Sequence, residues 1–172
     1  MAHDLRVQPF SASLLADVCD FDCGKEPWQV EVAQWIKNRS SEADCAVKWI
    51  NRGTKVWLYR TNEGALVGYG SLGTSKWRLR QDAALRETVS IIPSFGVQGC
   101  FQGEPKDLPR EERYAYQIMS DLISKSSGQN TRILGLFVDR RNARAITFYN
   151  RIGFQALPDE GGPYIKMFLE LA

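Results

Sequence analysis

The sequence of 172 residues has a single histidine, His3, and this scarcity excludes a common kind of catalytic site. A Ser-His-Asp or Cys-His arrangement needs a histidine that neighbouring groups hold in position. His3 lies near a chain end, where side chains are often poorly held. Nucleophilic catalysis through histidine is therefore not expected.

Cysteines are few as well, and none of them forms a Cys-x-x-Cys pair. Beside a single histidine they offer no zinc-ligand spacing, so we expect no metal site. The thiols are interpreted as reduced and partly buried. The four positions are Cys19, Cys23, Cys45 and Cys100.

Long apolar runs and a strong net charge are also missing. No stretch approaches the roughly 20 apolar residues of a membrane span. The N-terminal residues lack a basic region followed by an apolar block, so we expect a cytoplasmic protein without membrane contact. The net charge of +2 is small for a protein that wraps nucleic acid, so a nucleic-acid partner is not expected. The length suits one domain over residues 1–172.

Apolar spacing predicts a mixed α/β protein in which hairpin strands come first and helix crossovers come later. Pro93 lies inside a predicted strand, where it cannot donate to a ladder, so we expect a bulge or splayed position there. Residues 75–85 are expected to form a basic, irregular connection. Strands are predicted at 5–10, 55–60, 65–72, 87–97, 132–138, 154–157 and 163–171, and helices at 13–18, 26–38, 109–125 and 142–152.

The most informative segment is Val138–Phe154, which follows a predicted strand. It contains Asn142-x-x-Ala145, then Phe148-Tyr149, then Gly153-Phe154. This pattern resembles the second acetyl-coenzyme A motif of the GCN5-related N-acetyltransferases, the GNAT family. Residues Phe21–Gly24 and Val67–Leu72 resemble a bacterial branch of that family. The resemblance implies the GNAT fold, a central mixed, mostly antiparallel sheet of six to seven strands with helices on both faces. It also implies acetyl-coenzyme A as cosubstrate and no metal.

The first coenzyme motif of that family is matched less well. Phe101-Gln102-Gly103 resembles its opening, but residues 104–112 replace the compact glycine pair before Tyr114. An ordinary surface loop is the alternative interpretation. On the resemblance, coenzyme binding is expected from Phe95, Gly96, Val97, Gln102, Gly103, Arg113, Tyr114, Ala115, Asn142, Ala145, Phe148 and Tyr149. In that set Phe95, Gly96 and Val97 act through their backbone.

Acetyl transfer needs an unprotonated amine and a proton for the departing thiolate. For a lysine-like amine, deprotonation at pH 7 costs about 4.6 kcal/mol. Glu87 is the candidate base, acting through water lined by Tyr69, Ser71 and Ser90, or else it is a solvated strand end. Tyr149 is the candidate proton donor, or else a core tyrosine. Asn142 is expected to cap its helix, with a coenzyme contact implied by the resemblance.

Two groups of basic residues have alternative interpretations. Lys76, Arg78 and Arg80 either attract an anionic substrate or form a solvated connection. A second group either meets the 3′-phosphate of the coenzyme or solvates the start of a helix. Its members are Arg140, Arg141 and Arg144.

The leading hypothesis is an N-acetyltransferase that moves an acetyl group directly to a primary amine in a ternary complex. The amine is not identified by the sequence. Two alternatives stay open: a catalytically silent module that binds acyl-coenzyme A or a partner, and a toxin-like acetyltransferase of aminoacyl-tRNA. A homodimer is compatible with a family of this appearance.

Overall fold

The computed structural model describes residues 4–39, 44–80 and 84–172, so His3 lies outside the described residues. Eight strands form a mixed, mostly antiparallel sheet. They are β1 (Arg6–Pro9), β2 (Lys55–Arg60), β3 (Leu66–Trp77), β4 (Glu87–Ile92), β5 (Phe95–Val97), β6 (Ile133–Asp139), β7 (Gln155–Ala156) and β8 (Tyr164–Glu170). The α-helices are α1 (Pro27–Lys37), α2 (Ala46–Ile50), α3 (Tyr114–Ser127) and α4 (Ala143–Ile152). Three 3-10 turns are η1 (Ala12–Val18), η2 (Gly99–Phe101) and η3 (Arg110–Glu112).

The chain divides into two compact units, and β3 and α3 contribute residues to both. The first unit comprises residues 1–71 and 94–122, and the second comprises residues 72–93 and 123–172. A single domain over residues 1–172 stays a prediction. In the part of the chain that is described, no helix is long and apolar enough to cross a membrane.

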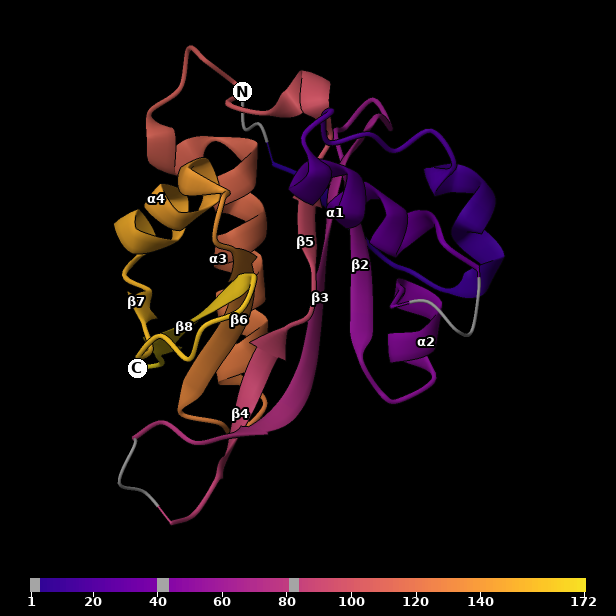
Figure 1. The fold of residues 1–172 in the computed structure, drawn as a ribbon. Coiled ribbons are helices and arrows are strands. Elements are labelled where there is room, and N and C mark those ends of the chain that lie inside the picture. Colours follow the sequence, from indigo (N-terminus) through magenta and orange to yellow (C-terminus); the bar gives the residue numbers. More distant parts are fainter. Residues whose placement is uncertain (1–3, 40–43, 81–83) are drawn as a thin grey trace. The chain divides into compact units, whose positions relative to one another are not determined.

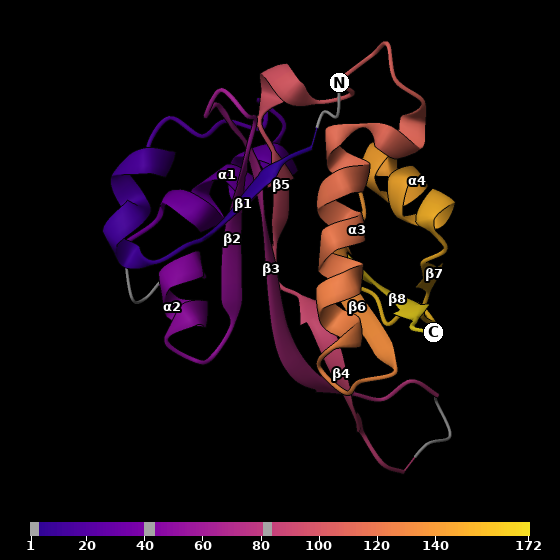
Figure 2. The same cartoon turned by 180° about the vertical axis from the view of Figure 1, so that it is seen from behind.

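In the first unit, helices pack on both faces of the strands (Figures 1 and 2). Tyr69 of β3 points toward α1, and its hydroxyl donates to the carbonyl of Val32 at 2.7 Å. Gly68 and Gly70 lie on the opposite face, where Ile118 and Leu122 of α3 pack closely over them. Alternation along β3 therefore presents a large side chain to one helix and small residues to the other. The buried cluster beside α1 comprises Phe10, Val18, Phe21, Cys23, Ala33, Trp35, Ile36, Ala46, Val56, Leu58 and Tyr69.

In the second unit, β4 and β6 are parallel, with Ser90 opposite Leu134, whereas β8 runs antiparallel to β6. The end of β3 pairs with β4 and places Trp77 opposite Glu87. The Trp77 ring lies over Gly135, where an added Cβ would come within 2.4 Å of it. In chain order α3 lies between the parallel strands β4 and β6, which is a helix crossover of the kind that the sequence predicted.

Three details of the predicted fold were wrong. The sheet has eight strands instead of six to seven, because the strand predicted at 87–97 breaks between Ile92 and Phe95. The break itself was expected at Pro93. Residues 75–77 continue β3, where pairing with β4 and packing on Gly135 hold them. Helix α2 was missed, because its five residues are too few to show a helical period.

Gly96 of β5 tests this packing. An added Cβ would lie 2.6 Å from Val32 Cγ1 and 2.8 Å from Tyr69 Cε1, both inside the first unit. We expect Gly96→Ala to lower the free energy of unfolding by about 1–3 kcal/mol through overpacking. Urea unfolding followed by circular dichroism measures it. Gly99→Ala is the matched control, because the nearest atom to its Cβ is 3.5 Å away. Equal stability of both variants would contradict the packing described here.

Candidate functional site

Helix α4 of the second unit begins and ends where the sequence predicted. Asn142 precedes the helix, and its Oδ1 accepts a hydrogen bond from the Ala145 N–H at 3.1 Å. Gly153 follows the helix with φ of 114°, a conformation that glycine adopts readily. The predicted cap is thus confirmed. It fixes the phase of the helix and with it the direction of each side chain on α4.

Tyr149 is the chemically distinctive residue of this helix. Only 8% of its surface is exposed, and its ring makes edge contacts with Phe148 and Phe154 at 5.4 and 5.7 Å between centroids. Burial raises the pKa of its phenol, so it keeps its proton at neutral pH. Among the residues that the structure describes, none hydrogen-bonds to its hydroxyl. The ring is therefore largely buried, and no described protein group accepts the hydroxyl proton.

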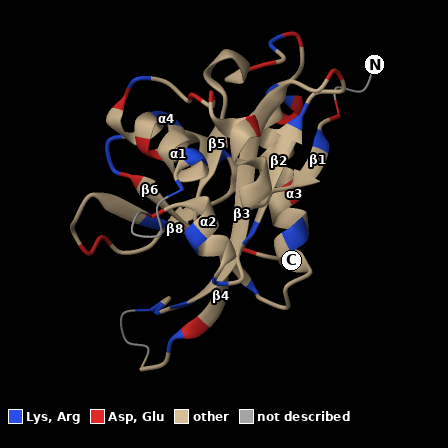
Figure 3. Ribbon diagram, turned by 90° about the vertical axis from the view of Figure 1, so that its right-hand side faces the viewer, with Lys and Arg blue, Asp and Glu red and all other residues tan. Residues whose placement is uncertain are grey.

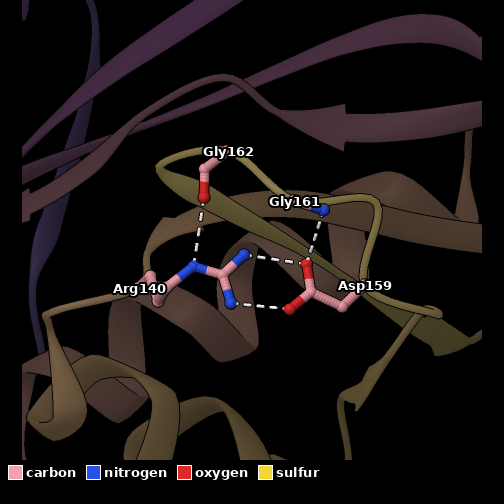
Figure 4. Close-up of polar contacts among 4 residues, drawn as sticks. All are labelled: Arg140, Asp159, Gly161 and Gly162. Carbon is pink, nitrogen blue, oxygen red and sulfur yellow. Dashed lines mark hydrogen bonds and ion pairs between the residues drawn. The ribbon is translucent and has the colours of Figure 1, made fainter.

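Arg140 binds a neighbouring loop (Figure 4). Its Nη1 and Nη2 donate to Asp159 at 2.6 and 2.8 Å, and its Nε donates to the Gly162 carbonyl at 3.0 Å. Asp159 also accepts from the Gly161 N–H at 2.9 Å. The guanidinium holds the pKa of this carboxyl well below its usual range. All three donor nitrogens of Arg140 are thus engaged by the loop before β8.

Arg141 is held in a similar way. Its Nε and Nη2 donate to the carboxylate of Asp139 at 3.0 and 2.8 Å. Asp139 is buried, and the Arg141 hydrogen bonds lower the pKa of its carboxyl. A contact between either Arg140 or Arg141 and a coenzyme phosphate would compete with these bidentate pairs.

In the first unit, strand β5 pairs with β3 and leads into a loop that is tied to the segment before α1. The Asp22 N–H donates to Gln98 Oε1 at 2.9 Å, and the Gly99 N–H donates to the Asp22 carbonyl at 2.7 Å. Gln102 Nε2 donates to the carbonyls of Cys23 and Val97 at 2.7 and 3.1 Å. The amide of Gln102, a predicted coenzyme ligand, therefore positions the backbone.

The loop then leads through Gly103 and residues 104–112 to the start of α3. The Tyr114 N–H donates to the Glu104 carbonyl at 2.9 Å, and Arg113 Nε donates to the Leu108 carbonyl at 3.3 Å. Burial raises the pKa of the Tyr114 phenol, and nearby carboxylates, Glu63 and Glu104 among them, add to the effect. Ala115 lies in the first turn of α3, where backbone N–H groups face an anion most favourably. The acidic loop opposes that attraction.

The hydroxyls expected to line a proton relay have protein hydrogen-bond partners instead. Ser71 Oγ donates to the Ser94 carbonyl at 2.6 Å and accepts from the Ser94 N–H at 3.0 Å. The Tyr69 hydroxyl donates to Val32, so its 2.6 Å contact with Ser94 Oγ has Ser94 as donor. In the second unit, Ser90 Oγ donates to Gln129 Oε1 at 2.8 Å. The protons of these hydroxyls point to fixed acceptors.

Glu87 is exposed at the amino end of β4. In the backbone register it lies opposite Trp77, and its carboxylate faces solvent at the end of the strand. Figure 3 shows acidic and basic residues interspersed along the ribbon. No group of His, Cys, Asp and Glu within the described ranges could hold a metal ion.

The predicted site residues fall into one set in each unit, and their roles stay predictions. The set in the first unit is Phe95, Gly96, Val97, Gln102, Gly103, Arg113, Tyr114 and Ala115; that in the second is Glu87, Asn142, Ala145, Phe148 and Tyr149. Ser94 was not singled out from the sequence, although a serine directly after a strand proline was a usable signal. The pairing of Arg140 with Asp159 had no local signal.

No family model matches the sequence, and no curated protein does. Solved structures match over nearly the whole chain. A mutant of the toxin AtaT, bound to acetyl-CoA and the C-terminus of the antitoxin AtaR, has a TM-score of 0.65 at 19% identity, covering 98% of this chain and 94% of that chain. A Desulfovibrio desulfuricans protein assigned to the GNAT family has a TM-score of 0.62 at 16% identity, covering 98% and 99%. The chain has the fold of the GNAT acetyltransferases.

A third structure is AtaT complexed with acetyl-methionyl-tRNAfMet, with a TM-score of 0.62 at 20% identity over 97% of this chain and 95% of that chain. At such identities the likeness establishes the fold. The GNAT fold predicted from the resemblance of Val138–Phe154 is thereby confirmed. An argument for the activity of this chain must therefore come from its own side chains.

Asn142 lets the cap be separated from a ligand role. We expect Asn142→Ala to lower the free energy of unfolding by about 1 kcal/mol, because the Ala145 N–H loses its acceptor. Asn142→Asp, whose carboxylate also caps, should retain most of the stability. Urea unfolding of the three proteins checks this, and an Asn142→Ala protein as stable as the wild type would contradict the cap.

Proposed function

We propose that this chain is an N-acetyltransferase that moves an acetyl group from acetyl-coenzyme A directly to a primary amine in a ternary complex. The observation that carries the proposal is Tyr149, a buried phenol on the GNAT fold whose hydroxyl donates to no described protein group. Among the described residues the fully buried side-chain polar atom without a partner is Trp35 Nε1, so the Tyr149 hydroxyl keeps some access to solvent and to a bound molecule. The position therefore suits a hydrogen bond to a bound molecule.

The predicted residues of each unit have features that suit acetyl-coenzyme A. Acetyl-coenzyme A supplies the acetyl group as a thioester. The short strand β5 offers extended backbone beside β3. The first turn of α3, at Ala115, offers a helix N-terminus for phosphate. Arg113 adds a cation directly before that turn. In the second unit, Asn142, Ala145 and Phe148 share α4 with Tyr149.

The reaction balances with one proton to move. The amine lone pair attacks the acetyl carbonyl carbon, the C–N bond forms, the C–S bond breaks, and the amine proton ends on the sulfur. We propose that Tyr149 donates a hydrogen bond to the developing thiolate. Its raised pKa means that the phenol stabilises this charge while keeping its proton. Before this step a protonated amine must lose a proton of its own, and we propose that Glu87 takes that earlier proton through water.

A second candidate narrows the acceptor to the α-amino group of an aminoacyl-tRNA. The solved complex of AtaT with acetyl-methionyl-tRNAfMet supports it. The chemistry supports it too, because an α-amine with a pKa near 8 needs about 1 kcal/mol for deprotonation at pH 7, far less than a lysine-like amine. Under this candidate a nucleic acid would be a partner, which the small net charge did not lead us to expect.

We propose a bacterial cytoplasmic location for this enzyme. The four cysteines, all of them described, are free, as is usual in a reducing compartment. The Desulfovibrio desulfuricans neighbour is consistent with a bacterial source. A homodimer stays a prediction.

Tyr149→Phe tests the proposed hydrogen bond from the phenol to the departing thiolate. We expect kcat to fall by about 100-fold or more. The calorimetric Kd for acetyl-coenzyme A should hold within about 3-fold, because a hydrogen bond made as charge develops affects the chemistry alone. Stability should hardly change, because no described hydrogen bond is removed.

Tyr59→Phe is the matched control for that experiment. The Tyr59 hydroxyl donates to Asp121 at 2.6 Å, so this variant should lose about 1–2 kcal/mol of stability and keep its kcat. Absence of acetyl-coenzyme A binding by the wild type would overturn the proposed function and favour the silent, partner-binding module.

The pKa of the acceptor amine provides a second test. At pH 7 we expect kcat/KM for methionyl-tRNA to exceed that for a lysine side-chain amine by at least about 10-fold, and the gap to narrow toward pH 9. Thiol release gives the rates. Glu87→Gln should lower the rate with the lysine side-chain amine more than the rate with methionyl-tRNA. A pH-independent ratio would contradict this account of the acceptor.

A further inference from the structure

An extra residue interrupts the pairing with β3 just after the end of β4, and the proposed chemistry does not use this irregularity. Gly73 pairs with Ile91, and Gly70 pairs with Phe95. Between these pairs β3 has two residues, 71 and 72, whereas the opposite strand has three, 92–94. One extra residue on one strand is a β-bulge. It changes the register of everything that follows.

The side chain of Ser71 holds the last residue of the bulge. Ser71 is fully buried, and its hydroxyl serves both backbone groups of Ser94, accepting from the N–H at 3.0 Å and donating to the carbonyl at 2.6 Å. Pro93, directly before it, has no N–H to offer a ladder. One hydroxyl thus takes the place of a ladder partner at Ser94.

A second contact fixes the Ser94 side chain. Its Oγ donates to the Tyr69 hydroxyl at 2.6 Å, and Tyr69 donates to the Val32 carbonyl at 2.7 Å. The Tyr69 ring stacks on Trp35 of α1 with an interplanar angle of 8°. Ser94 is therefore bound to β3 through its backbone and to α1 through Tyr69.

The register that follows decides which face Gly96 occupies. With the bulge, Gly96 pairs with Tyr69 and lies against Val32. A one-residue slip would turn Gly96 to the face of Gly68 and bring Phe95 and Val97 toward α1. The backbone groups of β5 proposed to receive the acetyl donor would then be displaced.

We propose that Ser71 is a positioning residue for acetyl-coenzyme A, which it serves by fixing Ser94 and with it the register of β5. Ser71 touches no substrate in this role. The inference rests on the proposed function, because it concerns the strand that is expected to receive the donor. It assigns to Ser71 an effect on donor affinity, and no direct effect on the acetyl-transfer step.

The test is calorimetric binding of desulfo-coenzyme A and steady-state kinetics for Ser71→Ala. We expect the Kd and the KM for the donor to rise by about 10-fold or more, with kcat at saturation within about 3-fold. Ser71→Thr, which keeps the hydroxyl, should recover most of the affinity. Ser126→Ala is the matched control: this buried hydroxyl also donates to a backbone carbonyl, that of Ile123 at 2.7 Å, but belongs to the second unit.

Amide hydrogen exchange separates the two ways of failing. Faster exchange at residues 94–97 in Ser71→Ala, with weaker donor binding, supports the proposal. Unchanged donor affinity in Ser71→Ala overturns it and leaves the proposed function intact. Equal weakening by Ser126→Ala also overturns it, since the effect would then reflect general destabilisation. If the wild type binds no donor at all, both proposals fall, whatever the exchange shows.

Discussion

The hydrogen bonds between the Ser71 side chain and the Ser94 backbone are the constraint on which the first unit depends. They allow a proline and an extra residue to lie inside a strand without leaving buried backbone groups unpaired. From that point on, each contact follows the new register. Gly96 comes under α1, Val97 accepts from Gln102, and the Gln98 side chain reaches Asp22. A slip of one residue would undo all of these contacts together.

Features with a local cause could be predicted from the sequence. Asn142 and Gly153 bound α4 because caps act through neighbouring backbone groups, and the break at Pro93 follows from one missing N–H. Features with a distant cause could not. The serine that supports the break lies 23 residues away in sequence, and the Gln102 amide reaches Cys23 across 79 residues. Residue type indicated a polar role at both positions, but the partner depends on the fold.

The arginines near α4 show how sequence overstates free charge. Arg140 and Arg141 look like a phosphate site because they precede a coenzyme motif. In the structure each forms a bidentate pair with a carboxylate, Asp159 and Asp139. Lys106 in the loop before α3 likewise lies 3.5 Å from Glu104. Binding of the donor phosphates would therefore depend mainly on backbone N–H groups at the start of α3 and on Arg113. The number of basic residues in the sequence overstates how many are free to take part.

The same reasoning applies to the proton at the reacting centre. A phenol whose pKa is raised by burial is a poor acid against a thiol with a pKa near 8.5, so Tyr149 cannot protonate the leaving sulfur at equilibrium. It can lower the energy of the developing thiolate through a hydrogen bond, provided that the proton reaching sulfur comes from the amine. An amine of low pKa releases that proton most readily. In the proposed reaction an α-amine acceptor is therefore favoured over a lysine-like one, because an α-amine costs less to deprotonate at pH 7.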